Sequence, residues 1–178
     1  MITYSLDSNN TLVDVGGDWE AFALANHGDD LTRENVLGMP LFRFIVGAEV
    51  TMIYKALFTK VRNQQRPLSF IFRCDSLTCR RQMMIHIDPL PSLGLAVRTE
   101  LLEDAQRDEV PLLEPGVPHT EEIIHICCIC SDVQSTGNRW VPIEMESARR
   151  HLLECDAVPR LSHGYCPDCM ENQLKLLE

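Results

Sequence analysis

The stretch RPLSFIFRCDSLTCRRQMMIHIDPLPSLGLAVRTELL, residues 66–102, decides the fold of the first half of this chain. It holds three β-type runs, at residues 66–74, 79–90 and 94–102. In each run apolar and polar residues alternate, which gives every strand one apolar face. The apolar positions are Leu68, Phe70, Phe72, Met83, Ile85, Ile87, Leu95 and Val97. Strands of this kind form an antiparallel sheet that buries one face.

The residues before this stretch predict two more strands and a helical middle. Runs at residues 2–7 and 11–16 are joined by polar turn residues, which is typical of a hairpin. Residues 19–28 predict one helix, and residues 48–65 predict a longer one. The longer helix carries apolar residues at helical spacing: Val50, Ile53, Tyr54, Leu57 and Val61. This order predicts an α+β fold, with a five-stranded antiparallel sheet and helices on one of its faces.

Two local features accompany this order of elements. Trp19 and Phe22 lie in the first predicted helix, and the stretch VLGMPLFRFI, residues 36–45, precedes the long helix. Together with the three closing strands, these features resemble the PAS sensor family over residues 1–102. The resemblance implies a sensory or scaffolding domain, often with a small cavity between helices and sheet, and often dimeric.

The histidines of this half are the candidates for a haem ligand in a PAS-like domain. His86 shares its strand face with Gln82 and Asp88, which indicates a solvated side chain. His27 stands beside Gly28 at the end of the first helix, where capping is expected. A cavity lined by Phe70, Phe72, Leu95 and Val97 is a further hypothesis, but the same residues are needed for core packing.

The loop between the first and second of these three runs, RCDSLTCRR, carries two cysteines and a charge cluster. Cys74 and Cys79 flank this loop, so a cross-strand disulfide is one hypothesis, although a reducing compartment disfavours it. Asp75 stands among Arg73, Arg80 and Arg81. We interpret this cluster as exposed ion pairs that fasten the hairpin, each contributing about 0.2–1 kcal/mol. Docking of a partner is the alternative.

Residues 103–122 contain most of the surplus acid of the chain. They hold seven acidic side chains and one basic side chain, and the net charge of the whole chain is −10. Three prolines and little periodicity predict a linker between a domain at residues 1–102 and a second one at residues 123–178. No segment offers a basic face for phosphate, so nucleic acid is not an expected partner.

The last third of the chain contains two Cys-x2-Cys pairs. Cys127 and Cys130 form the first pair and Cys166 and Cys169 the second, with residues 131–165 between them. Each pair aims two sulfurs at one point, and four thiolates satisfy the tetrahedral preference of zinc with no open position. The sequence therefore predicts a four-cysteine zinc site.

The residues between the two pairs predict little core. A strand is expected at Trp140 and Val141, and a second short helix after Cys169. Between them, a helix with one apolar stripe is expected, formed by Met145, Ala148, Leu152 and Cys155. About 56 residues with so little to bury need a metal in order to fold. We expect serine at any of the four cysteines to melt residues 123–178 and to leave residues 1–102 folded.

The pattern CxxC, W, E, SHGxCPxC in this tail is similar to a small cysteine-rich, zinc-ribbon-like module attached to bacterial signalling proteins. Other chemistry remains open for the same cysteines. Iron or an iron–sulfur cluster uses the same ligands, which makes a redox or iron–sulfur sensor the alternative function. CPDC is similar to the motif of thioredoxin-type oxidoreductases, which is a third interpretation. His163 is a candidate to replace one cysteine or to contact a sulfur. Cys128 and Cys155 fall outside the spacing and are expected to be small buried residues.

The start of the chain has no basic stretch followed by an apolar run, and no 18 apolar residues stand together. We therefore expect a cytoplasmic protein without a membrane segment, in which eight cysteines serve metal binding or thiol chemistry. The expected function is non-enzymatic signalling: a PAS-like sensor domain, coupled to a structural zinc module, that acts by contact with a protein partner. Homodimers are common among PAS relatives.

Overall fold

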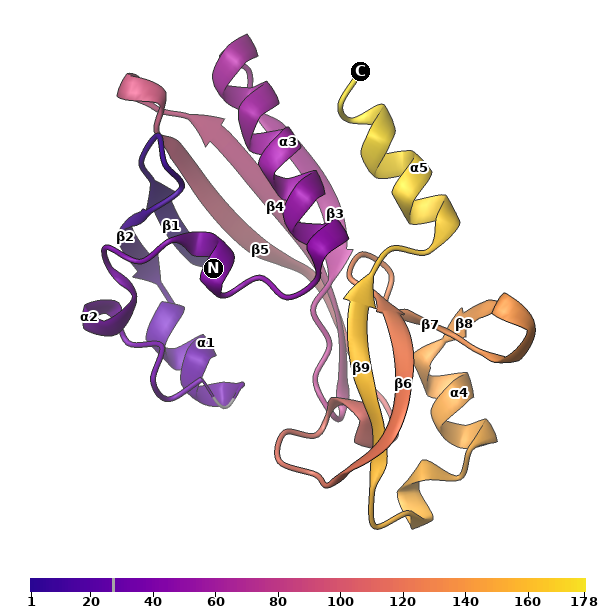
Figure 1. The fold of residues 1–178 in the computed structure, drawn as a ribbon. Helices are drawn as coiled ribbons and strands as arrows, with labels where there is room; N and C mark the ends of the chain where they lie inside the picture. Colours follow the sequence, from indigo (N-terminus) through magenta and orange to yellow (C-terminus); the bar gives the residue numbers. More distant parts are fainter. Residues whose placement is uncertain (27) are drawn as a thin grey trace.

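The N-terminal half of the protein is built on one antiparallel sheet. The computed structural model describes residues 1–26 and 28–178, and its strands and helices are shown in Figure 1. The first sheet has the order β2-β1-β5-β4-β3. Its strands are β1 (Ile2–Leu6), β2 (Leu12–Gly17), β3 (Leu68–Arg73), β4 (Cys79–Pro89) and β5 (Leu95–Gln106). The five antiparallel strands predicted from the sequence are confirmed.

Helices lie against the apolar face of this sheet. They are α1 (Trp19–Ala25), α2 (Arg33–Val36) and α3 (Ala48–Gln64). The predicted stripe of α3 is buried at Val50, Ile53, Leu57 and Val61, and Phe58 joins it. Tyr54 is only half-buried and makes edge contacts with Phe58 and Phe70. The haem-ligand candidate His27 lies outside the described residues.

A second sheet of four strands forms the C-terminal half, in the order β8-β7-β6-β9. Its strands are β6 (His119–Cys127), β7 (Asp132–Gln134), β8 (Trp140–Pro142) and β9 (Val158–Gly164). β8 is the strand predicted at Trp140 and Val141. β6 and β9 are parallel, and the other pairs are antiparallel. Helices α4 (Ile143–Arg149) and α5 (Pro167–Lys175) complete this half.

The prediction that α4 buries an apolar stripe is wrong. The helix ends at Arg149, and Met145 is 62% exposed. The buried face is formed instead by Ile143, Glu146 and Ser147. A polar face is tolerated inside because the carboxylate of Glu146 accepts hydrogen bonds from Ser135, Arg149 and Arg150.

The segment expected as a linker is largely folded. β5 runs to Gln106 and remains paired with β4, and β6 already begins at His119. Between them, Val110 and Leu112 are buried in the core of the second sheet. In the sequence, exposed acidic residues surround the few apolar residues of this segment that are buried. The pattern therefore resembles that of a linker.

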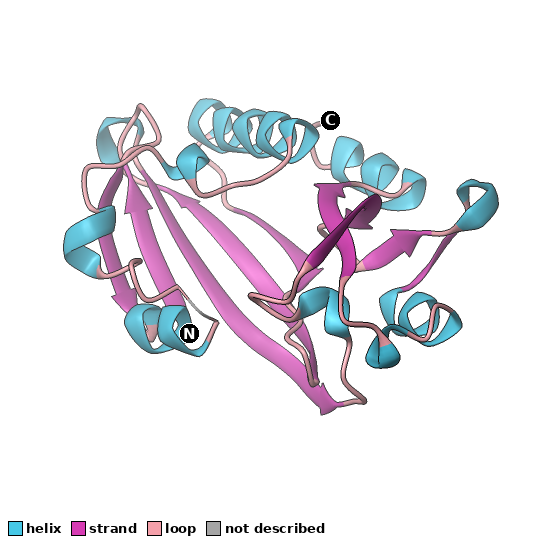
Figure 2. Ribbon diagram, turned by 60° about the horizontal axis from the view of Figure 1, so that its bottom comes forward, coloured by secondary structure: helices cyan, strands magenta, loops and turns pink. Residues whose placement is uncertain are grey.

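The core of the first half extends into the C-terminal half. Tyr165 is a buried member of that core, and Met170, Leu176 and Leu177 pack against it. Both views show α5 beside α3, and the Lys60 Nζ donates to the Leu176 carbonyl at 2.8 Å (Figures 1 and 2). The two halves therefore share apolar contacts.

The buried carboxylate of Glu146 predicts that the protein loses stability in acid. Hydrogen bonds from Arg149, Arg150 and Ser135 outweigh burial and hold the pKa of Glu146 at about 2, against an ordinary value of 4.5. A carboxyl with a lowered folded pKa stabilises the protein above its unfolded pKa, and this contribution is lost as pH falls through the folded pKa. We expect the free energy of unfolding to fall between about pH 4.5 and pH 2. Glu146→Gln should flatten this slope.

Urea unfolding at a series of pH values measures this slope. Glu154→Gln is the control, because Glu154 is exposed in the same region. An unchanged slope in Glu146→Gln would contradict the assignment.

Candidate metal centre

The four cysteines predicted as ligands lie together at the ends of two parallel strands. β6 pairs with β9 so that Cys127 stands opposite Gly164. The first Cys-x2-Cys turn follows β6, and the second follows β9 and opens α5. Because neighbouring parallel strands end at the same edge of a sheet, the two turns meet there. The Cys128 N–H donates to the Gly164 carbonyl at 3.0 Å and ties them together.

The sulfur positions suit one metal ion. The Sγ atoms of Cys127, Cys130, Cys166 and Cys169 all lie within 4.8 Å of one another. The Sγ atoms of Cys130 and Cys166 are 3.8 Å apart. A tetrahedral ion with bonds of about 2.3 Å to sulfur separates its ligands by about 3.8 Å. The cluster could therefore hold a metal ion with little rearrangement.

Backbone N–H groups stabilise both Cys-x2-Cys turns. Cys166 is the N-cap of α5, and its Sγ accepts a hydrogen bond from the Cys169 N–H at 3.5 Å. The N-terminus of a helix stabilises a thiolate. In the first turn, the Ser131 N–H donates to the Cys127 carbonyl at 3.0 Å, and Ser131 has a φ of 59°. This left-handed residue closes the turn.

In the absence of a metal ion, the thiols of Cys127, Cys130 and Cys169 have different pKa values. The hydrogen bond from Cys130 lowers the pKa of Cys127 to about 5. The same hydrogen bond raises the pKa of Cys130, and burial raises the pKa of Cys169. One thiolate is thus favoured over several, because like charges in a small volume repel. A divalent cation would reverse this balance, since coordinating thiols are deprotonated.

The other sulfur and histidine candidates lie outside this group. His163 is exposed and is not one of the clustered ligands. Cys128 is half-buried against the core of the first half, and Cys155 is exposed, so the expectation that both are buried is wrong for Cys155.

Cys74 and Cys79 are free thiols, and the disulfide hypothesis finds no support. The Cys74 N–H pairs with the Arg81 carbonyl, so Cys74 faces Arg81 and not Cys79 across the hairpin. His86 lies on the polar face of the sheet, as expected, but its side chain is only 20% exposed and is therefore not the solvated side chain that was predicted. Its ring contacts Ser69 at 2.8 Å and Glu100 at 3.4 Å.

A pocket of about 430 Å³ lies between α1 and the first sheet. Its lining is mainly apolar and includes Trp19, Phe72 and Cys74. Thr99 also lines it, and the buried Thr99 hydroxyl has no partner among the described residues. Of the four residues expected to line a cavity, only Phe72 does so. Phe70, Leu95 and Val97 are core residues.

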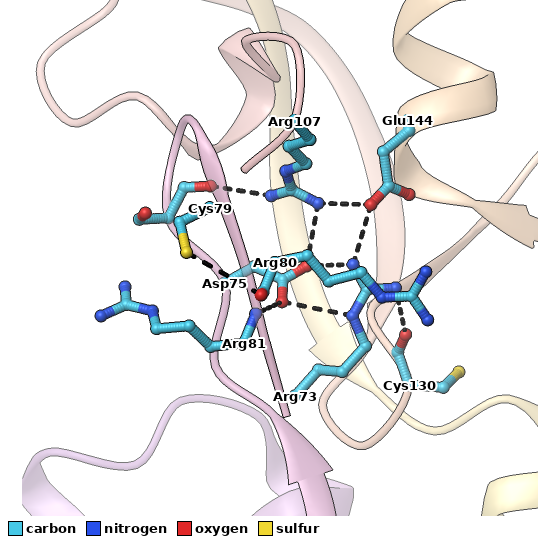
Figure 3. Close-up of polar contacts among 9 residues, drawn as sticks. Arg73, Asp75, Cys79, Arg80, Arg81, Arg107, Cys130 and Glu144 are labelled. Atoms are coloured by element: carbon cyan, nitrogen blue, oxygen red, sulfur yellow. Dashed lines mark hydrogen bonds and ion pairs between the residues drawn. The ribbon is translucent and has the colours of Figure 1, made fainter. Parts of the chain in front are cut away.

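The charge cluster of the β3–β4 loop is buried, which corrects the expectation of exposed ion pairs. The Asp75 side chain is 2% exposed, and those of Arg73 and Arg107 are 9% exposed. Arg73 and Arg107 both bind Asp75 and Glu144 (Figure 3). Burial raises the pKa of Glu144, but hydrogen bonds from its own N–H and from both arginines more than compensate.

The predicted members of this cluster were only partly right. The guanidinium of Arg81 turns to Asn26 and to the ring of Phe22, and only its N–H donates to Asp75. Arg80 is exposed. Arg107 and Glu144 were missed, because they stand 32 residues or more from Asp75 in the sequence.

No family model matches this chain, and no curated protein matches it either. No helix among residues 1–26 and 28–178 combines the length and the apolar character needed to cross a membrane.

Proposed function

We propose that this protein is a non-enzymatic signalling protein in which a PAS-like sensor half is joined to a structural zinc centre. Cys127, Cys130, Cys166 and Cys169 are the zinc ligands. The observation that carries the proposal is the cluster of their four sulfurs within 4.8 Å. Four thiolates complete a tetrahedral shell and leave no position for a substrate, which favours a structural role over a catalytic one.

Iron is the alternative metal, because a single ferrous or ferric ion takes the same four thiolates. An iron–sulfur cluster is less favoured. Its several irons and sulfides stand between the cysteines, so the cysteine sulfurs must lie farther apart than around one ion. The Sγ atoms of all four cysteines lie within 4.8 Å of one another, which suits one ion.

Metal analysis and an absorbance spectrum of protein purified without air distinguish these metals. We expect one equivalent of zinc and no visible band. One equivalent of iron with a coloured spectrum would favour the redox-sensor alternative. Metal-free protein would contradict the proposed centre.

A thiol oxidoreductase is the third interpretation, and the burial of Cys166 argues against it. CPDC does follow a strand, β9, and opens a helix. However, Cys166 is only 6% exposed and is surrounded by three other cysteines. A reactive cysteine must be accessible to its substrate.

The sensor role of residues 1–102 rests on the resemblance to PAS domains. It is supported by the five-stranded antiparallel sheet, by the helices on its apolar face and by the pocket beside Trp19. We propose that the sensor half acts by contact with a protein partner in the cytoplasm, and that the protein forms a homodimer. Light scattering that gives a monomer at all accessible concentrations would contradict the homodimer.

The pocket predicts a stabilising substitution. A buried hydroxyl without a partner costs about 1–3 kcal/mol. Thr99→Val removes that hydroxyl at nearly constant shape, so we expect the free energy of unfolding to rise by about 1 kcal/mol. Urea unfolding measures this change.

Thr59→Val is the control, because the exposed Thr59 hydroxyl donates to the Lys55 carbonyl at 2.8 Å. It should give no gain. A loss of stability in Thr99→Val would mean that the Thr99 hydroxyl has a partner in the pocket.

A further inference from the structure

Arg73, the last residue of β3, holds the first Cys-x2-Cys turn from the other half of the protein. Its backbone N–H donates to the Ile129 carbonyl at 2.8 Å. Its Nη1 donates to the Cys130 carbonyl at 3.0 Å, a contact drawn in Figure 3. One residue therefore fixes two successive carbonyls of the turn that carries two of the four sulfurs.

The guanidinium of Arg73 is itself held in place. Its Nε donates to Asp75 at 3.2 Å, and its Nη2 donates to Glu144 at 2.9 Å. Arg107 binds the same two carboxylates, so that two positive and two negative groups balance. A buried charge that is paired and fully hydrogen-bonded has one preferred geometry. Arg73 thus presents Nη1 to the Cys130 carbonyl from a fixed position.

We propose that Arg73 is a positioning residue of the four-cysteine centre, so that metal affinity in the C-terminal half depends on a strand of the N-terminal half. This inference rests on the proposed metal site. Residues that orient ligands without touching the metal typically contribute a factor of about 10–100 in affinity. Cys130 is the ligand directly affected, because its carbonyl and its Sγ belong to the same residue.

Arg73→Lys is the sharpest test. Lysine keeps the positive charge, so the charges of the cluster still balance. A single ammonium lacks the planar fork that reaches Asp75, Glu144 and the Cys130 carbonyl together. We expect zinc affinity, measured by competition with a chelator, to fall by about 10-fold or more. Arg80→Lys, on the neighbouring strand with an exposed side chain, should bind zinc like the wild type.

A spectroscopic measurement separates positioning from a general loss of stability. Co²⁺ in a tetrahedral thiolate site absorbs visible light, and its bands report ligand geometry. Co²⁺-saturated Arg73→Lys should show shifted bands, whereas saturated Arg80→Lys should not. Destabilisation alone would leave the spectrum at saturation unchanged.

Glu144→Gln serves as a second variant in case Arg73→Lys does not fold. The Glu144 side chain is 30% exposed, and Glu144 is not part of the turn. The variant removes the charge of one of the two carboxylates that hold Arg73. It should lower zinc affinity in the same direction and by less. Wild-type affinity and spectrum in the variants would overturn the role of Arg73. Failure of the wild type to bind zinc or Co²⁺ would instead overturn the proposed centre.

Discussion

Cys166→Ser should release the metal and lower the stability of both halves of the protein. Three thiolates leave an incomplete shell, and structural zinc sites supply folding free energy directly. Tyr165 is buried in the core of the first half, and Met170 packs against that core. Unfolding of the second Cys-x2-Cys turn therefore exposes part of the core of the first half as well. This result differs from the expectation drawn from two separate domains, in which residues 1–102 remain unaffected.

Metal content and thermal unfolding of the full chain measure this effect. Cys155→Ser is the matched control: Cys155 is exposed, and its Sγ donates a hydrogen bond to the His151 carbonyl. It should keep one equivalent of metal and the wild-type melting temperature. One retained equivalent in Cys166→Ser would show that Cys166 is not a ligand.

Asp75→Asn should destabilise the protein by about 3–5 kcal/mol. The substitution keeps the shape of the side chain and removes its charge. Arg73 and Arg107 then share only Glu144, which leaves a buried positive charge without compensation. The cluster also joins β3, the segment after β5 and α4, so its loss weakens the contact between the two halves.

Denaturant unfolding of Asp75→Asn and Asp88→Asn distinguishes buried from exposed pairs. Asp88 pairs with Arg98 at 3.5 Å, and both side chains are more than a third exposed. Its loss should cost about 0–1 kcal/mol. Equal effects of the two substitutions would mean that the Asp75 cluster is no stronger than a surface pair.

Patterns with a short period were readable in the sequence. Alternation of apolar residues predicted β3, β4 and β5, and helical spacing predicted α3. The pairing of Cys127 with Cys130 and of Cys166 with Cys169 was equally visible, because a turn of four residues fixes its own geometry. The same local logic failed for α4, where the buried face contains Glu146 and not an apolar stripe.

Contacts between residues that are distant in the sequence determined how the metal site and the charge cluster are assembled. The sequence alone determined which cysteines form turns, but only the parallel pairing of β6 with β9 brings the two turns to one point. The sequence also placed Asp75 among arginines, but only the tertiary structure supplied Arg107 and Glu144 and buried the cluster. The physical reason is that local periodicity reports which face of an element is apolar. Which elements meet, and how deeply a charge is buried between them, depends on contacts between residues that are distant in the chain.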